Sequence, residues 1–267
     1  GDHRDLHLSI RRQRQMCIRD SSYTLETLTR GAVGDSASLS PQALALDLMV
    51  QDPFLEDYEE WRIKQRFALA TLYYATGGED SWYRKTYWLN HTMHECLWWY
   101  AGLDDPSSMN VTGLSSNVSG NPISYPDFGL YLPESPNPCE EEDPSNNMSQ
   151  GVFQNLWLMG NTLKGSLPPE LYMLTALKTL FLSSRDLTGT ISTLIGDLKS
   201  MKSVILATKL SGTMPTEIGL LQNMTYLNLN GNLLTGSLPM ELGQLVDVSS
   251  FMADANVSHH ADVPYFG

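Results

Sequence analysis

A four-fold internal repeat in the second half of the chain constrains the fold more than any other feature. Four glycines recur at spacings of 24, 23 and 24, and they are Gly165, Gly189, Gly212 and Gly236. A pair of apolar residues in an L-x-L-like pattern precedes each glycine, and a fifth pair follows the last; the pairs are Leu156/Leu158, Leu180/Leu182, Val204/Leu206, Leu227/Leu229 and Phe251/Ala253. A repeat of this length buries its leucines only against its neighbours. We therefore expect residues 151–267 to form a solenoid of four repeats and a truncated fifth.

The residues around each glycine follow one pattern, which the first repeat shows as Leu163-Lys-Gly165-Ser-Leu167-Pro168. This pattern resembles the plant-type form of the leucine-rich repeat family, whose consensus is LxxLxLxxNxLxGxIPxxLGxL. The resemblance implies a leucine-rich repeat solenoid of the α/β type. Its parallel strands would line the concave face, and the turn-rich G-x-[LIM]-P half would form the opposite wall.

The same family carries a buried asparagine whose side chain hydrogen-bonds the turn backbone of the next repeat. This position falls on Asn161, Asn232 and Asn256. The sequence departs from the pattern at Arg185, and again near Thr208 and Lys209, where one residue is missing. We expect a weaker asparagine ladder in these two repeats, with water taking over some of the bonds.

Residues 41–101 are expected to form a mainly helical N-terminal cap. Ser40-Pro41 is a helix-start signal, Asp52-Pro53 ends that segment, and a second helix is expected over residues 58–76 before the glycine pair at 77–78. The block resembles the N-terminal caps of cell-surface and secreted leucine-rich repeat proteins, especially those of diatoms and related microalgae. In such caps a helix, tryptophans and a cysteine pair shield the first repeat. The cap tryptophans here are Trp82, Trp88, Trp98 and Trp99.

Residues 102–150 are expected to form a Pro-rich, acidic insert loop. They contain seven of the fourteen prolines and the acidic run 140–143. A loop of this length in a compact domain needs a tether, and a disulfide between Cys96 and Cys139 would supply one. In the resembling caps the two cysteines usually stand close together, in a C-x-W-x-G-V-x-C pattern. Cys139 would stand in for the second of them after the long insert.

The first 21 residues resemble a translated sequencing adapter from a transposase-made DNA library, so we predict an adapter artefact without ordered structure. Without them the chain has 12 basic and 27 acidic residues, a net charge of −15, and its cysteines are Cys96 and Cys139. Residues 22–40 are small and polar and are expected to be a linker. An acidity of this size argues against a nucleic-acid partner, because phosphate contacts need clustered Lys and Arg.

Six N-x-[ST] sequons suggest a secretory-pathway surface. Five are expected to be glycosylated: Asn90, Asn110, Asn117, Asn147 and Asn223. The sixth, Asn256, also occupies a ladder position and is expected to stay unmodified.

No pattern in the sequence supports catalysis, a cofactor or a metal site. His91, His94 and Glu95 form an H-x-x-H-E order that does not fit the known zinc-protease motifs, and no third ligand is evident. We interpret them as polar residues of the cap and predict that the chain is not an enzyme.

The residue between the two apolar residues of each pair should point to the concave surface, because alternate side chains of a strand face opposite ways. The predicted ligand-binding residues are this row, Trp157, Phe181, Ile205, Asn228 and Met252, together with the flanking Tyr226 and Asn230. An apolar row with polar neighbours is typical of a recognition patch. The alternative is a structural stripe that a part of the protein missing from this sequence, or a glycan, covers.

Together these features predict an extracellular recognition module, secreted or at the cell surface, whose ligand is an unknown protein, peptide or glycan. We expect it to reach a membrane only through segments outside this sequence. The last repeat stops at residues 263–267 without a closing cap, so we expect a piece of a longer protein. Alternatives are the ectodomain of a receptor kinase truncated before its membrane span, a secreted inhibitor of wall-degrading glycosidases, and a wall- or ice-adhesive protein.

Overall fold

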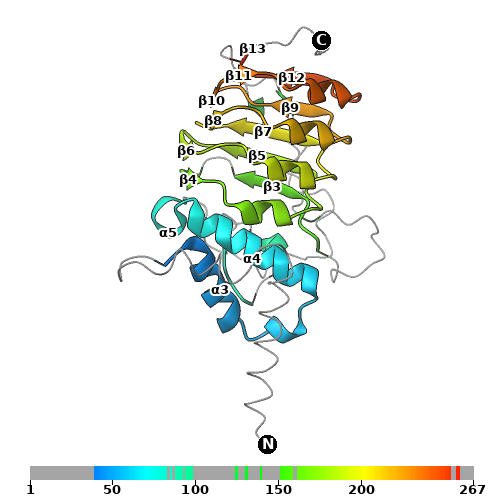
Figure 1. Ribbon diagram of the computed structural model, residues 1–267. Helices are drawn as coiled ribbons and strands as arrows, with labels where there is room; N and C mark the ends of the chain where they lie inside the picture. Colours follow the sequence, from blue (N-terminus) through cyan, green and yellow to red (C-terminus); the bar gives the residue numbers. More distant parts are fainter. Residues whose placement is uncertain are drawn as a thin grey trace, which may run out of the picture.

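A computed structural model of the chain shows a helical cap at the base of a column of stacked strands (Figure 1). It describes residues 39–82, 85, 88–92, 94–98, 124–125, 130–131, 139, 151–158, 161–253 and 257–258. The expected helical N-terminal segment is therefore present. The predicted adapter segment, almost all of the predicted linker and most of the insert lie outside the described residues.

The cap contains two main helices that begin and end at recognisable signals. Helix α3 spans Pro41–Gln51, and the Ser40 hydroxyl caps it by accepting a hydrogen bond of 3.1 Å from the backbone N of Ala43. Helix α4 spans Glu60–Ala75 and ends before Gly77, which adopts a left-handed φ of 98°. Shorter elements are η1 (Leu55–Asp57), α5 (Gly78–Ser81) and η2 (Glu95–Leu97).

Three of the four cap tryptophans pack into the hydrophobic core beside α4. Trp82, Trp88 and Trp98 are each exposed by less than a tenth. The Trp82 and Trp88 rings meet edge to face with 4.6 Å between their centroids, and Tyr73 of α4 packs against both. These rings form one core cluster with the leucines of the repeats, as expected of residues that shield the first repeat. Trp99 lies outside the described residues.

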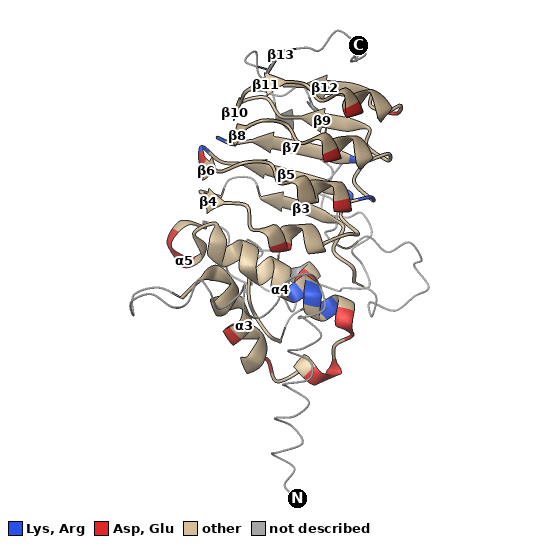
Figure 2. Ribbon diagram, viewed as in Figure 1, with Lys and Arg blue, Asp and Glu red and all other residues tan. Residues whose placement is uncertain are grey.

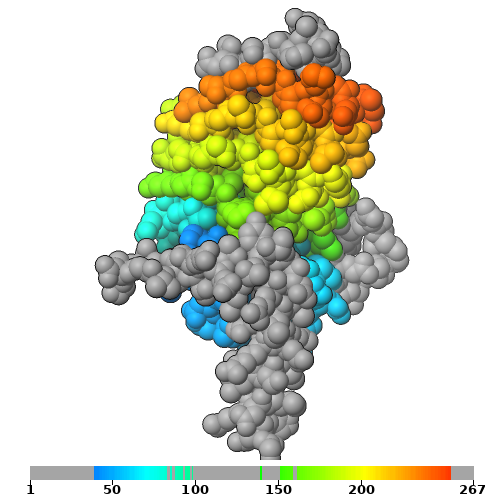
Figure 3. All heavy atoms as spheres, in the orientation of Figure 1, coloured from blue at the N-terminus to red at the C-terminus, as the bar shows by residue number. Residues whose placement is uncertain are grey.

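A five-stranded parallel sheet runs through the repeats in the order β12-β9-β7-β5-β3. Each strand contains the first residue of one apolar pair of the sequence, and the first three strands contain both; they are β3 (Asn155–Leu158), β5 (Thr179–Ser183), β7 (Ser203–Ala207), β9 (Tyr226–Asn228) and β12 (Ser250–Met252). The space-filling view shows successive repeats as contiguous bands (Figure 3). This is the solenoid that the repeat period predicts.

Short strands and 3-10 helices complete each repeat. The short strands are β4 (Lys164–Ser166), β6 (Asp186–Thr188), β8 (Ser211–Gly212), β10 (Leu233–Leu234), β11 (Gly236–Ser237) and β13 (Val257–Ser258). The 3-10 helices are η6 (Pro169–Met173), η7 (Thr193–Asp197), η8 (Thr216–Leu220) and η9 (Met240–Gln244). A further short pair, β1 (Ser124–Tyr125) and β2 (Leu130–Tyr131), is antiparallel and belongs to the insert.

The recurring glycines are required for two reasons: their backbone has a positive φ, and a neighbouring repeat leaves no room for a Cβ. Gly189 has a φ of 101°, and a Cβ there would lie 3.0 Å from Cβ of Ser166 in the preceding repeat. Gly212 and Gly236 are alike, with φ of 82° and 87° and close approaches to Thr190 and Thr213. Any other residue would strain the backbone and push successive repeats apart.

The asparagine ladder continues through the two repeats that lack the asparagine. Where Arg185 interrupts the pattern, the hydroxyl of the preceding Ser184 donates to the Leu163 carbonyl oxygen at 2.7 Å. In the shortened repeat, the Thr208 hydroxyl donates to Asn232 Oδ1 at 2.6 Å. Protein hydroxyls thus take over where we expected water. Asn161 and Asn232 are buried, and Asn256 lies outside the described residues.

The cap joins the first repeat through the end of α4. The backbone N of Lys164 in β4 donates to the Thr76 carbonyl oxygen at 2.9 Å. A Cβ at Gly165 would lie 2.6 Å from the Ala75 carbonyl oxygen, so only glycine permits this approach. The last turn of α4 therefore occupies the place that a preceding repeat would fill.

Candidate functional site

The strand register places the predicted ligand-binding row in one line across the sheet. Trp157 pairs with Phe181, Phe181 with Ile205, Ile205 with Asn228, and Asn228 with Met252. Their neighbours along each strand belong to the leucine core, so the row faces away from that core. None of the five strands carries a charged residue, and they are tan throughout Figure 2.

The first three residues of the row form a buried apolar cluster, separate from the main core. Trp157 is 9% exposed, and Phe181 and Ile205 are each 2% exposed. The Trp157 and Phe181 rings meet edge to face with 5.8 Å between their centroids. Tyr226 is partly buried and packs against this group. The concave face is therefore well packed over its first three strands.

The last two strands present a more polar part of the same face. Asn228 is buried, and its Oδ1 accepts a hydrogen bond of 2.9 Å from the backbone N of Asn230, whose side chain is exposed. Met252 is half-buried. Burial raises the pKa of Tyr226 above its ordinary value, and its buried hydroxyl has no hydrogen-bond partner among the described residues. Tyr226 therefore stays a neutral phenol at physiological pH.

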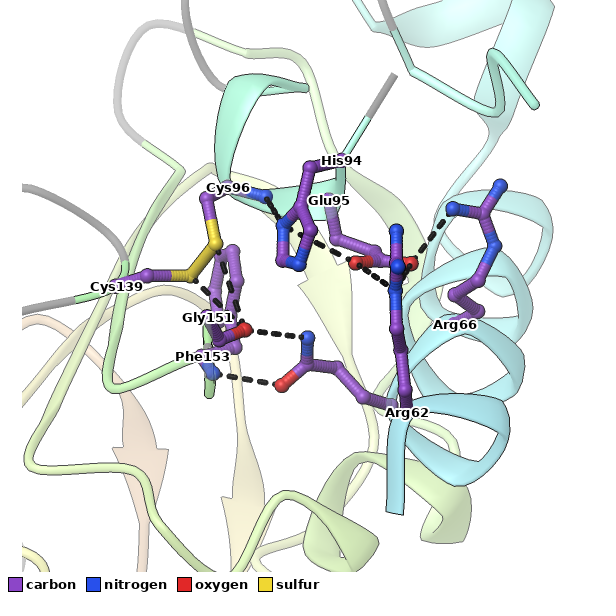
Figure 4. Close-up of a disulfide and its surroundings, with 9 residues drawn as sticks. Arg62, Arg66, His94, Glu95, Cys96, Cys139, Gly151 and Phe153 are labelled. Carbon is purple, nitrogen blue, oxygen red and sulfur yellow. Dashed lines mark hydrogen bonds and ion pairs between the residues drawn. A yellow bond between two sulfur atoms is a disulfide. The ribbon is translucent and has the colours of Figure 1, made fainter. Parts of the chain in front are cut away.

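A disulfide joins the cap to the insert at the edge of the first repeat (Figure 4). Cys96 and Cys139 are bonded, with their Cα atoms 5.6 Å apart. Both sulfurs lie within 3.5 Å of the carbonyl oxygen of Gly151, which also accepts a hydrogen bond from the side chain of Gln65. The Gln65 amide oxygen in turn accepts from the backbone N of Phe153. These contacts fix the chain just ahead of β3.

A buried cluster of charges lies beside the disulfide. The Arg66 guanidinium contacts Glu95 at 2.6 Å and Asp52 at 3.2 Å, and all three side chains are almost fully buried. Arg62 adds a contact of 3.2 Å to Glu95. Such a cluster holds η2 against α4 and the segment after α3. Sequence reasoning missed it, because nothing in the local pattern pairs residues so far apart.

His94 and the two cysteines bring potential metal-ligand atoms within 4.8 Å of one another. The two sulfurs are bonded to each other, however, so neither is the thiolate that a metal would need. Burial lowers the pKa of His94, and its Nδ1 lies 3.3 Å from the Cys96 backbone N, which donates to it. The H-x-x-H-E residues thus belong to the packing of the cap: His91 lies 3.5 Å from Asp52, and Glu95 binds the arginines.

Two of the predicted glycosylation sites fall in the described part of the chain. Asn90 is half-buried, and its Oδ1 accepts hydrogen bonds from the backbone N and the hydroxyl of Thr92. Asn223 is exposed, and its Nδ2 donates to the Lys199 carbonyl oxygen at 2.8 Å. The other predicted sites, Asn110, Asn117 and Asn147, lie outside the described residues.

Comparison with known families identifies the repeat architecture. A sequence model described as Leucine Rich Repeat matches residues 223–245, which contain β9 and η9. Together with the parallel strands at the family's spacing, this match decides the fold. The chain folds as a leucine-rich repeat solenoid. No curated protein shows significant sequence similarity to it.

Several solved structures resemble part of this chain. The BIR2 ectodomain from Arabidopsis thaliana is 29% identical over 45% of the chain, with a TM-score of 0.40. The ectodomain of the Arabidopsis thaliana receptor kinase GASSHO1/SCHENGEN3, solved with CASPARIAN STRIP INTEGRITY FACTOR 2, is 31% identical over 43%, with a TM-score of 0.39. A plant ice-binding protein is 26% identical over 45%, with a TM-score of 0.36. The chain spans 63%, 14% and 37% of these three proteins, less than two thirds of each.

Within the described ranges, no helix combines the length and the apolar composition needed to cross a membrane.

Proposed function

We infer that this leucine-rich repeat chain is a non-catalytic recognition module of the plant type, which binds a protein, peptide or glycan on its concave face. The observation that carries the proposal is the continuous row from Trp157 to Met252. It crosses all five strands in register. A sheet built from successive repeats offers an extended, rigid surface, which is how solenoids present ligand contacts.

The accessible end of the row has the composition of a protein interface. Tyr226, Asn230 and Met252 are half-buried or exposed, and tyrosine and methionine are enriched where proteins meet. Residues 151–267 contain six basic and eight acidic residues, so this half of the chain is nearly neutral. That balance favours a peptide, protein or glycan over a nucleic acid.

An extracellular location is supported by a disulfide between the cap and the insert and by an exposed sequon in the repeats. Disulfides such as Cys96–Cys139 persist in oxidising compartments. The sequon at Asn223 lies on an exposed turn, as a glycan requires. Both features fit a secreted protein or the outer part of a cell-surface protein.

A binding screen with defined probes tests the proposal. The chain, produced in a secretory host, is screened against a synthetic library of short peptides and an array of cell-wall glycans. A triple variant, Tyr226→Ala, Asn230→Ala and Met252→Ala, should lose saturable binding. The matched control, Gln244→Ala with Asp247→Ala, changes exposed residues outside the five-stranded sheet and should keep it. Saturable binding that survives the triple variant would contradict a role for the concave face.

A further inference from the structure

Both faces of the central strands are buried, although the solenoid has only one five-stranded sheet. In β5, Leu180 and Leu182 lie in the leucine core, while Phe181 between them faces the opposite side. Phe181 is nevertheless only 2% exposed, and so is Ile205, its partner in β7. Alternate side chains of a strand cannot share one face. Something other than the core must therefore keep water from Phe181 and Ile205.

The row itself, the cap helices and the 3-10 helices do not supply this cover. Side chains on neighbouring strands, ~4.8 Å apart, shield one another's flanks but leave their outward surfaces open. The cap helices lie at the base of the column, and the 3-10 helices belong to the repeat wall (Figure 1). Trp157 gives a second indication that this face is shielded from water. Its Nε1 is buried and has no hydrogen-bond partner among the described residues.

The insert is tethered where it can reach this face. One of its ends is fixed by the disulfide at Cys139, and the chain rejoins the repeats at Gly151, four residues ahead of β3. Cys96 and Cys139 are separated by 43 residues. Half of such a loop extends up to ~70 Å, whereas the step from β3 to β9 spans only ~15 Å.

The insert also carries a segment whose chemistry suits an apolar surface. Residues 123–132 read Ile-Ser-Tyr-Pro-Asp-Phe-Gly-Leu-Tyr-Leu, and six of these ten are apolar or aromatic. Strands β1 and β2 within it pair as an antiparallel hairpin, with Tyr125 opposite Leu130. An isolated two-stranded hairpin is at best marginally stable in water, so it needs a surface to pack on.

We propose that the concave face over Trp157, Phe181 and Ile205 is an intramolecular docking surface whose occupant is the hairpin segment 123–132 of the insert. The apolar hairpin and the apolar row each need a partner, and the disulfide holds the two at a high effective concentration. The proposal goes beyond ligand recognition. It divides the face into a part bound in cis and a free part around Tyr226, Asn230 and Met252.

Photo-crosslinking in the full chain tests the docking directly and does not depend on any ligand. Phe128 is replaced with p-benzoylphenylalanine, and the irradiated protein is digested with trypsin. We expect intrachain crosslinks to the peptides that contain Phe181 (residues 179–185) and Ile205 (residues 203–209). The same photoreactive group at Val111, elsewhere in the insert, should not label these peptides. Crosslinks between chains, which would indicate a second copy, or crosslinks only to other peptides would overturn the proposal.

Hydroxyl-radical footprinting gives an independent measurement. In the unmodified protein, oxidation of residues 179–185 should be slow, because Phe181 is buried. The double variant Phe128→Ser and Leu130→Ser should raise that rate several-fold, while oxidation of the peptide that contains the core residue Leu69 should stay constant. An unchanged rate at Phe181 would show that another segment covers the row. A similar rise in the oxidation rates of both peptides would show that the variant unfolds, and it would also count against the proposal.

Discussion

The hydroxyl of Thr208 donates a hydrogen bond of 2.6 Å to Oδ1 of Asn232, which lies 24 residues further along the chain. The same oxygen accepts from the backbone N of Leu210, and the amide nitrogen donates to the carbonyl oxygens of Leu206 and Leu229. One buried side chain therefore satisfies backbone groups in two successive repeats. Asn232 joins the shortened repeat to a regular one.

Asn232→Ala should lower the free energy of unfolding by ~3 kcal/mol or more, because it leaves several buried backbone groups without partners. Thr208→Val should cost only ~1 kcal/mol, since Asn232 keeps its other bonds. Urea unfolding followed by circular dichroism measures both, with the exposed Ser237→Ala as control. Equal losses for the two variants would contradict a central role for Asn232.

Gly189→Ala should destabilise the protein more than Gly231→Ala. Both glycines have a positive φ, 101° and 85°, so both variants share a backbone cost of ~1–2 kcal/mol. Only at Gly189 would the new Cβ meet a neighbour, Ser166, whereas nothing lies within 4 Å at Gly231. When Ser166→Gly is added to Gly189→Ala, the midpoint of thermal unfolding should rise to that of Gly231→Ala. If the two alanine variants were equally stable from the start, close packing would not explain the repeat glycine.

Glu95→Gln should lower the free energy of unfolding by ~3–5 kcal/mol, because it leaves Asp52 as the one buried carboxylate facing the positive charges of Arg66 and Arg62 in this cluster. The control is Glu60→Gln. That residue pairs with Lys64 at 2.6 Å, but its side chain is 63% exposed, so the expected loss is under ~0.5 kcal/mol. Chemical denaturation at neutral pH compares the two. Similar losses would mean that the buried cluster contributes no more than a surface ion pair.

Stability should fall as the pH drops from 7 to 5, in part through His94. Burial lowers the pKa of this histidine in the folded state, the flanking arginines lower it further, and Glu95 opposes them. The unfolded chain, with a histidine pKa of about 6.5, then binds the proton more readily, so acid favours unfolding. The stability that neutral His94 contributes is therefore fully present above about pH 7 and is lost as the pH falls below that value. His94→Gln, which keeps a hydrogen-bond acceptor, should flatten the slope of unfolding free energy against pH, and an unchanged slope would assign the effect to other groups.

The repeat period, together with the resemblance to plant-type leucine-rich repeats, was enough to predict the sheet, the approximate strand positions and the line of residues from Trp157 to Met252. This succeeds because each repeat contacts only its neighbours, so a local pattern determines the packing. The same repeat pattern predicted that the recurring glycines lie in the turn-rich half of each repeat. The pattern could not show that Ser184, one position ahead of Arg185, completes the hydrogen-bond ladder, because it names only the asparagine position for this role.

Apart from the Cys96–Cys139 disulfide, which was predicted, the features that join distant parts of the chain escaped sequence reasoning. Asp52, Arg66 and Glu95 meet from three separate segments, and no period relates them. The burial of Phe181 and Ile205 was likewise not predicted, because strand alternation says which way a side chain points and nothing about what lies opposite. The charge cluster of the cap and the burial of the strand face therefore depend on long-range contacts that only the folded chain reveals.

The junction between α4 and β4 has a consequence for how such proteins can vary in length. Thr76 offers its carbonyl oxygen to Lys164, as the strand of an earlier repeat would. The end of α4 thus presents to β4 the same kind of hydrogen-bond acceptor that a preceding repeat presents to the next one. Repeats could be duplicated or deleted anywhere after β4 without a change in the cap. The same N-terminal cap can therefore begin solenoids with different numbers of repeats.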